Sequence, residues 1–320
     1  MQYIIDRSTP LASGGTSKIY RCQDAIGIRG VCKVMPKVND GARCKYENEV
    51  ACLRTLSFSP KVVQLYDAVE AESEYVLVME WCRGGAVRDY IGGGRYVGVG
   101  TGTGIYSVNT VASIMRGVMR GLVHIHSMGI VHMDIKPCNV LFTDTSDDAE
   151  VKLADFGSAM RMDSRAGADA GADTTNTIAG TPWYMSPESL RSEITPKSDV
   201  WSAGVMAYQL LTGRMPFDDV GEAAPRVAHI WRKIILEEPL WTGPRWEAVS
   251  SAARDFVRLC MTKEPGARPT AMECLAHPWL EKTGCGDRFT GTPLVMPQDC
   301  KNFECSGESS FMYARTWELI

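Results

Sequence analysis

Three polar residues, Asp134, Asn139 and Asp155, have side chains that could together bind a metal ion and orient a reacting hydroxyl group. Pro137 lies between the first two, so this segment is expected to be a stiff loop rather than a helix. A carboxylate and an amide oxygen suit Mg²⁺, which takes few protein ligands and keeps substrate phosphates in its coordination shell. The remaining carboxylate would be available to orient a hydroxyl nucleophile.

Two short apolar segments are expected to bring these side chains together. Residues 140–142 follow Asn139, residues 151–154 precede Asp155, and both segments read as strands. Gly157 lies where the chain must turn after the second strand. The sequence therefore predicts a hairpin that gathers the three side chains at one site.

The order of these residues resembles the protein kinase family. The string His-Met-Asp-Ile-Lys-Pro-Cys-Asn at residues 132–139 is followed by Asp-Phe-Gly at residues 155–157, and the ordered pair is far more specific than either motif alone. That order disfavours the alternative of a buried turn with a charged rim. The resemblance implies a catalytic base at Asp134, magnesium ligands at Asn139 and Asp155, and a cation at Lys136 that neutralises the transferred phosphoryl group.

A lysine inside an apolar strand marks the second part of the predicted site. Lys33 lies in the segment 30–34, where its ammonium group needs an anion unless it is exposed. A helix expected over residues 46–56, from apolar residues at helical spacing, offers Glu49 or Glu47 as that anion. The kinase resemblance favours Glu49 and implies that Lys33 holds the α- and β-phosphates of ATP.

Other nucleotide contacts follow from the same resemblance. Residues 11–20 look like the glycine-rich hairpin of kinases, residues 62–66 and 75–80 read as strands, and the break at residues 81–85 is the expected hinge. Met79 would guard the back pocket, and backbone groups of the hinge would face the adenine. The implied nucleotide contacts are Leu11, Gly14, Ile19, Val31, Lys33, Met79, Glu80, Cys82 and Leu141.

Five positions depart from the family pattern. Ala12 and Ser17 replace glycines of the glycine-rich hairpin. Ala86 and Cys138 stand where carboxylates often read basic residues upstream of the phosphoacceptor. Met133 replaces an arginine that often grips a phosphate on the activation segment. The first two departures would weaken the grip on the nucleotide. Ala86 and Cys138 predict weak selection for arginine in the substrate, and Met133 predicts little dependence on phosphorylation of the activation segment.

The segment expected to position a peptide lies downstream. Residues 180–188, Gly-Thr-Pro-Trp-Tyr-Met-Ser-Pro-Glu, resemble the peptide-positioning loop of Ser/Thr protein kinases. The resemblance implies a buried ion pair between Glu188 and Arg268. The helix expected over residues 198–211 is apolar nearly all round, and Asp199 near its start can cap amides and hold the catalytic loop.

Chain length and composition set the architecture. The chain has 320 residues, 45% hydrophobic and 22% charged, which is ordinary for a soluble globular protein but exceeds what one core usually fills. The resemblance implies an α+β, bilobal, protein-kinase-like fold, with a small β-rich N-lobe containing one main helix and a larger, mostly α-helical C-lobe. The expected divisions are the N-lobe (1–82), the C-lobe (83–282) with a flexible glycine-rich insertion (92–104) and an activation segment (155–188), and a C-terminal tail (283–320).

Charge and cysteine content limit the partners and the compartment. The net charge of −4 gives no electrostatic reason to expect nucleic acid or an anionic membrane, and no apolar run approaches membrane-spanning length. Eleven cysteines without a CxxC pair or a secretory signal predict reduced thiols in a cytosol-like compartment. Too few residues precede the first motif for a targeting peptide, so a cytoplasmic monomer is expected unless the sequence begins late.

The expected function is that of a Ser/Thr protein kinase using ATP and Mg²⁺, with Ser or Thr hydroxyls of protein substrates as acceptors. Residues 33–37 and 201–217 resemble most the calcium/calmodulin-dependent and plant calcium-dependent kinases, although the sequence contains no EF-hand loop. Two other classes remain open. A pseudokinase scaffold is opposed by the full set of predicted catalytic residues, and a small-molecule kinase of the aminoglycoside type by residues 180–188 and Arg268.

Overall fold

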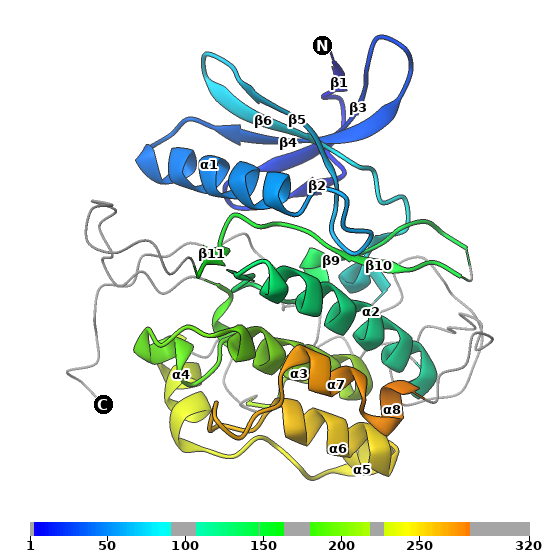
Figure 1. The fold of residues 1–320 in the computed structure, drawn as a ribbon, viewed down its shortest axis with the longest axis vertical. Coiled ribbons are helices and arrows are strands. Elements are labelled where there is room, and N and C mark those ends of the chain that lie inside the picture. Colours follow the sequence, from blue (N-terminus) through cyan, green and yellow to red (C-terminus); the bar gives the residue numbers. More distant parts are fainter. Residues whose placement is uncertain (1–2, 91–106, 147, 163–179, 218–226, 282–320) are drawn as a thin grey trace.

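The computed structural model describes residues 3–90, 107–146, 148–162, 180–217 and 227–281. They form a sheet-rich N-terminal part with one main helix and a largely helical C-terminal part (Figure 1). The expected α+β, bilobal fold is confirmed. The predicted glycine-rich insertion, Thr177 within the activation segment, and the predicted tail lie outside the described residues.

The N-terminal sheet is antiparallel, with strand order β1-β3-β4-β6-β5 and β2 paired to β3. Ile19, Lys33 and Leu77 are paired across neighbouring strands and therefore share one face of the sheet. The opposite face carries a small core of its own that includes Cys32 and Val78. The strands are β1 (Ile4–Asp6), β2 (Ala12–Ser13), β3 (Lys18–Gln23), β4 (Arg29–Pro36), β5 (Leu65–Glu70) and β6 (Glu74–Met79).

Helix α1 (Asp40–Thr55) packs on the face of the sheet that carries Lys33 (Figure 1). Asn39 caps its start, because the Asn39 side chain accepts a hydrogen bond from the amide of Ala42. The helix therefore begins at Asp40 rather than at residue 46 as expected. Its buried side chains recur at helical spacing, as predicted, and are Tyr46, Glu49, Val50, Cys52 and Leu53.

Short strands lie between the N-terminal sheet and the helical C-terminal part (Figure 1). β9 (Val140–Phe142) and β10 (Val151–Leu153) make the predicted antiparallel hairpin, and β7 (Gly85–Ala86) pairs with β9 just beyond the hinge. β8 (Ile130–Val131) pairs with β11 (Met160–Arg161), so the chain segments before and after the hairpin are also tied together.

The strand expected over residues 62–66 is wrong in its position, because β5 begins only at Leu65. Val62 instead forms an isolated parallel bridge with Leu153, and the amide of Val63 donates to the Leu153 carbonyl at 3.0 Å. Val62 and Val63 are buried, as they would be in a strand, but they pair with β10 of the β9–β10 hairpin rather than with the N-terminal sheet.

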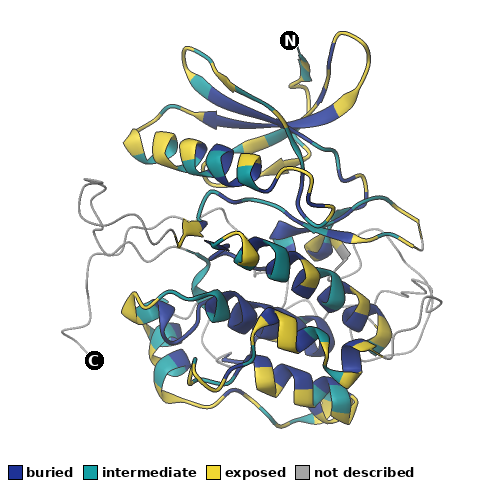
Figure 2. Ribbon diagram, in the orientation of Figure 1, coloured by how far each residue is buried: buried dark blue, intermediate teal, exposed yellow. Residues whose placement is uncertain are grey.

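The C-terminal part is built around α3, which is buried on almost every side, as predicted (Figure 2). α2 lies beside α3 and also contacts β10 and α7. Among the described residues, no helix combines the length and the apolar character needed to cross a membrane. The helices are α2 (Val108–Ser127), α3 (Pro196–Thr212), α4 (Val227–Leu236), α5 (Pro244–Glu247), α6 (Ser251–Cys260), α7 (Ala271–Leu275) and α8 (Pro278–Glu281).

Candidate active site

Asp134 lies at the centre of a cluster of hydrogen-bond donors. Its Oδ1 accepts from the backbone amide of Thr181 at 3.0 Å and from the Thr181 hydroxyl at 2.7 Å. Its Oδ2 accepts from the side-chain amide of Asn139 at 3.0 Å and lies 2.8 Å from the ammonium nitrogen of Lys136. Burial alone would lower the pKa of Lys136, but the Asp134 carboxylate raises it, so the lysine stays charged. A hydroxyl group approaching Asp134 would meet a carboxylate that is already fixed in orientation.

The loop that carries Asp134 is held by Asp199 at the start of α3. The fully buried Asp199 carboxylate accepts from the amides of His132 at 2.8 Å and Met133 at 2.9 Å. Its Oδ2 also lies 2.8 Å from Nε2 of His126 on α2. The predicted anchoring role of Asp199 is therefore confirmed.

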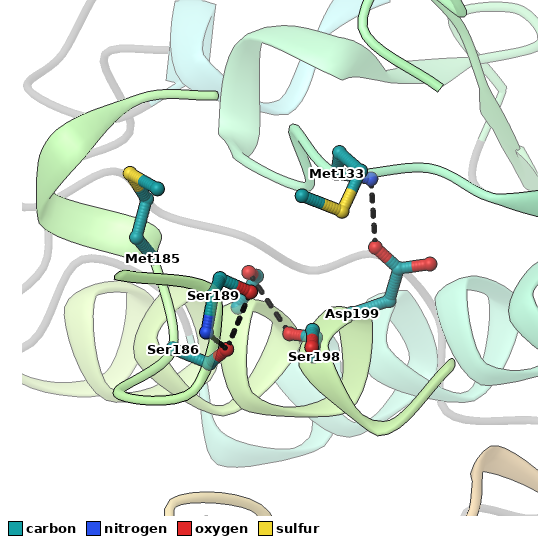
Figure 3. A pocket seen from close by; sticks show the side chains of 7 residues that line it. Met133, Met185, Ser186, Ser189, Ser198 and Asp199 are labelled. Atoms are coloured by element: carbon teal, nitrogen blue, oxygen red, sulfur yellow. Dashed lines mark hydrogen bonds between the residues drawn. The ribbon is translucent and has the colours of Figure 1, made fainter. Parts of the chain in front are cut away.

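Met133 has a left-handed backbone conformation, with φ +68°, which is uncommon for a residue other than glycine. Gly180 fits tightly against it, since a Cβ at Gly180 would lie 2.5 Å from the Met133 carbonyl oxygen and Gly180 itself has φ +112°. Figure 3 shows a small pocket next to this contact. Lysine and arginine are absent from the described residues that line it, which are Met133, Met185, Ser186, Ser189, Ser198, Asp199 and Ser202.

Lys33 joins α1 to the segment that carries Asp155. Its Nζ lies 2.9 and 2.7 Å from the two carboxylate oxygens of Glu49 and 2.7 Å from Oδ1 of Asp155. Glu47, the other candidate partner, pairs instead with Arg43 at the surface. Burial alone would lower the pKa of Lys33, but the neighbouring carboxylates of Asp155 and Glu49 raise it. For Glu49 burial is the larger effect, so its pKa is raised although Lys33 lies next to it. Lys33 is therefore a fixed cation.

Asn139 and Asp155 lie close together because the Asn139 carbonyl accepts a hydrogen bond from the amide of Ala154 at 2.9 Å. The side-chain nitrogen of Asn139 donates to Asp134, which leaves its Oδ1 as a candidate metal ligand. Although burial opposes ionisation, the Lys33 ammonium holds the pKa of Asp155 well below its usual range. The Asp155 side chain is nevertheless 43% exposed, so it can reach a ligand.

This donor set fits Mg²⁺ only in the presence of a substrate that supplies oxygen ligands. Within the described ranges, no group of three or more His, Cys, Asp or Glu side chains is placed to hold a metal ion by itself. One amide oxygen and one ionised carboxylate match the few protein ligands that Mg²⁺ takes alongside phosphate and water oxygens.

Three of the predicted apolar nucleotide contacts lie on the same face of the N-terminal sheet as Lys33. Ile19 is paired with Lys33, and Val31 with Met79, so all of them lie on the same face of the N-terminal sheet. Leu141 lies on β9, between the N-terminal sheet and the helical part, and packs against the main core. The structure thus brings Ile19, Val31, Met79 and Lys33 to one face of the N-terminal sheet.

Three of the predicted nucleotide contacts, Leu11, Gly14 and Ile19, belong to the glycine-rich hairpin. The amide of Leu11 donates to the Ile19 carbonyl at 2.7 Å, and the amide of Gly14 donates to the Ser17 carbonyl at 2.8 Å. The hairpin is therefore closed by its own backbone despite the replaced glycines.

The backbone groups of the two predicted hinge contacts, Glu80 and Cys82, are partly taken up by other hydrogen bonds. The amide of Glu80 donates to the Gln64 carbonyl at 2.9 Å, and the Glu80 carboxylate pairs with Lys152 at 2.6 Å. Of its polar backbone groups, only the carbonyl of Glu80 is left for an adenine. Cys82 is buried, and its carbonyl accepts from the amide of Gly85 at 3.2 Å.

Thr181 is a site residue that the sequence analysis did not identify individually. Besides its two bonds to Asp134, its hydroxyl oxygen lies 2.7 Å from Nζ of Lys136. The available signal was a hydroxyl residue directly after Gly180 in the predicted peptide-positioning loop. Thr181 connects that loop to the candidate base and the neighbouring lysine.

The ion pair expected between Glu188 and Arg268 is present and buried. The two guanidinium nitrogens lie 2.6 and 2.9 Å from the two carboxylate oxygens. Burial would raise the pKa of Glu188, but the hydrogen bonds and charge of Arg268 lower it. The pair fixes the end of the segment that begins at Gly180.

Comparison with known proteins agrees with this geometry. Residues 6–280 match the family model of the protein kinase domain. The chain is 35% identical over 278 residues to the serine/threonine-protein kinase PEPKR2 of Arabidopsis thaliana, covering 87% of the chain and 53% of that protein. It is 34% identical over 274 residues to calcium-dependent protein kinase 24 of Oryza sativa subsp. japonica, covering 84% and 49%.

A third relative is calcium/calmodulin-dependent protein kinase type 1 of Caenorhabditis elegans, 32% identical over 274 residues and covering 84% of the chain and 72% of that protein. The chain spans about half the length of the first two relatives. The match to the family model includes every residue placed in the site, from Leu11 to Arg268. The kinase group expected from the sequence is confirmed, and the chain belongs to the protein kinase family.

Proposed function

We propose that this protein is a Ser/Thr protein kinase that transfers the γ-phosphoryl group of ATP to Ser or Thr hydroxyls of protein substrates. The observation that carries the proposal is the convergence of Asp134, Lys136 and Thr181 in one hydrogen-bonded cluster, close to the Lys33–Asp155 ion pair. The buried pair that fixes the peptide-positioning loop favours a protein acceptor over a small molecule.

In the proposed reaction, Asp134 orients the acceptor hydroxyl and receives its proton. Lys136, charged and next to Asp134, offsets negative charge on the phosphoryl group during transfer. Lys33 holds the phosphates of ATP, and Mg²⁺ bound through Asn139 and Asp155 would neutralise charge on them. Positioning and electrostatic stabilisation supply most of the rate enhancement in such a site.

A radiometric assay with Mg²⁺-ATP and general protein substrates tests the proposal, with Asp134→Asn as the blank. Phosphoserine or phosphothreonine above the blank supports it. No transfer above the blank would favour a pseudokinase scaffold, and transfer to an aminoglycoside but not to protein would favour the small-molecule class. The lobe boundaries, the cytoplasmic location and the monomeric state stay predictions.

Lys33→Met should reduce turnover by about 10²–10³-fold, the range expected when a preorganised charge is removed. Because burial already raises the pKa of Glu49, we expect Glu49 to take up a proton in the folded variant. Above about pH 4.3, the ordinary pKa of a glutamate, Glu49 would then be protonated in the folded variant but ionised in the unfolded chain. Because the folded state binds more protons, the variant's free energy of unfolding relative to wild type should fall as pH rises.

Turnover and urea unfolding at about pH 5 and 8 check both parts of this prediction. Lys37→Met is the matched control, because Lys37 follows the same strand but pairs with the exposed Glu70. Full turnover of Lys33→Met would remove the lysine from the mechanism, and a stability difference that does not vary with pH would refute the protonation of Glu49.

Thr177→Ala should keep most of the basal activity. Thr177, which lies outside the described residues, is eleven residues before Glu188, the position at which the kinase resemblance implies an activating phosphate. Met133 replaces the arginine that would grip that phosphate, so a charge of about −1.5 to −2 there lacks its usual bidentate partner. Initial rates of wild type, phosphatase-treated wild type and Thr177→Ala at saturating ATP decide this. A loss beyond about tenfold would contradict it.

Peptide substrates should show little selection for arginine upstream of the acceptor. Ala86 and Cys138 lack carboxylates, and Nη1 of the exposed Arg88 lies 4.0 Å from the Cys138 sulfur, which places a cation beside Cys138. Each missing charged hydrogen bond would forgo about 1.5–3 kcal/mol of binding. A positional peptide library measures the selection, and Cys138→Glu should increase it. Strong upstream selection for arginine by the wild type would show that other carboxylates compensate.

A further inference from the structure

Asn48 on α1 contacts the segment after Asp155 through three backbone carbonyl groups. Its side-chain nitrogen lies 2.7 Å from the Ala159 oxygen, 3.3 Å from the Phe156 oxygen and 3.5 Å from the Gly157 oxygen. All three partners are acceptors, so the side chain acts as a donor. The Cys52 thiol lies 3.9 Å from Asn48 Oδ1, which is consistent with this orientation of the amide.

The neighbouring residue holds the same turn by complementary bonds. Glu49 pairs with Lys33, and its carboxylate also accepts a hydrogen bond from the backbone of Phe156. Two consecutive residues of α1 therefore hydrogen-bond to the turn at residues 156–159, Glu49 as acceptor and Asn48 as donor. This turn follows directly on Asp155, whose left-handed backbone conformation, φ +65°, needs support from its surroundings.

We propose that Asn48 is a positioning residue that couples the placement of α1 to the placement of Asp155. The amide can satisfy these carbonyls only when the turn lies against α1, which is also the arrangement in which Lys33 reaches Glu49 and Asp155. Loss of the donor would weaken the link between helix and turn without removing a group that touches the phosphates. The inference rests on the proposed kinase function for its kinetic consequence but not for its structural one.

Asn48→Asp and Asn48→Ala separate this role from simple packing. Aspartate has nearly the same shape as asparagine, but its carboxylate cannot donate and would face three carbonyl oxygens. The positioning role therefore predicts that aspartate is worse than alanine, whereas a packing role predicts the reverse. Glu47→Gln is the matched control, because Glu47 lies next to Asn48 in sequence but pairs with the exposed Arg43.

Two measurements on the full chain test the proposal. Hydrogen exchange should become faster in Asn48→Asp across α1 and residues 154–161, and kcat/KM for ATP should fall by about tenfold to a hundredfold, the loss typical of a misplaced reacting group. Asn48→Ala should show smaller changes in both, and Glu47→Gln should match wild type. Exchange and kinetics unchanged in Asn48→Asp, or an aspartate variant closer to wild type than alanine, would overturn the proposal.

The exchange measurement keeps the two proposals distinguishable. If wild type transfers no phosphate but Asn48→Asp still exchanges faster at the turn, the coupling stands and the kinase function fails. If wild type is active and exchange at the turn does not respond to Asn48→Asp, the coupling fails and the kinase function stands.

Discussion

Asp134→Asn should lower kcat for phosphoryl transfer by about 10³-fold while leaving Mg²⁺-ATP binding nearly unchanged. An amide cannot accept the proton of the substrate hydroxyl. Its nitrogen would also face one of the donors that now converge on the carboxylate from Thr181, Asn139 and Lys136. The proposed nucleotide contacts around Lys33 do not involve the Asp134 side chain, so the affinity for ATP should survive.

Single-turnover kinetics and nucleotide titration of the purified variant separate these two effects. Asp148→Asn is the matched control, since Asp148 is an exposed carboxylate between β9 and β10 and should keep full activity. Turnover of Asp134→Asn within about tenfold of wild type would exclude Asp134 as the base. Loss of ATP binding would mean that the substitution acts through the nucleotide site.

Arg268→Met should lower the free energy of unfolding by about 3–5 kcal/mol, because it leaves the Glu188 carboxylate buried without its partner. The guanidinium group is fully buried, and it also donates to the carbonyls of Thr262 at 2.8 Å, Lys197 at 2.8 Å and Lys263 at 3.2 Å. The substitution therefore leaves several acceptors without a donor, in addition to breaking the ion pair.

Urea unfolding measures the loss, and the double variant Glu188→Leu/Arg268→Met shows its origin. If the cost comes from the unpaired charge, the double variant should lose less than the sum of the single variants. Arg43→Met, which breaks an exposed pair, should cost about 0.5 kcal/mol or less. Because Arg268 lowers the pKa of Glu188, the pair should stabilise the fold above about pH 4.3, and this contribution should be lost as pH falls. A cost below about 1 kcal/mol for Arg268→Met would contradict the prediction.

The arrangement of the loop around Asp134 was predictable because the residues that meet there are close together in the sequence. Asp134 and Asn139 are five residues apart, and their contact at 3.0 Å closes one local loop. Helical spacing predicted α1 but left Glu49 and Glu47 both open as partners of Lys33, and only the kinase resemblance favoured Glu49. In the structure Glu49 is buried against the sheet, whereas Glu47 pairs with Arg43 at the surface.

The missed contacts join segments far apart in the sequence. Asn48 and Ala159 are 111 residues apart, and Thr181 and Asp134 are 47 apart, so no local periodicity indicates their approach. The misplaced strand has the same cause. The apolar residues Val62 and Val63 predict burial, but their composition cannot say whether the N-terminal sheet or β10 lies opposite.

The burial of Asp199 has a consequence for the order in which parts of the molecule open. Its carboxylate fastens the amides of His132 and Met133 to α3, inside the most buried layer of the helical part. Segments held only by a few surface contacts open at low free-energy cost, whereas those tied to the core open only with it. We therefore expect the peptide bonds just before Asp134 to open only together with α3, so that hydrogen exchange at these amides would report the unfolding of the helical part as a whole.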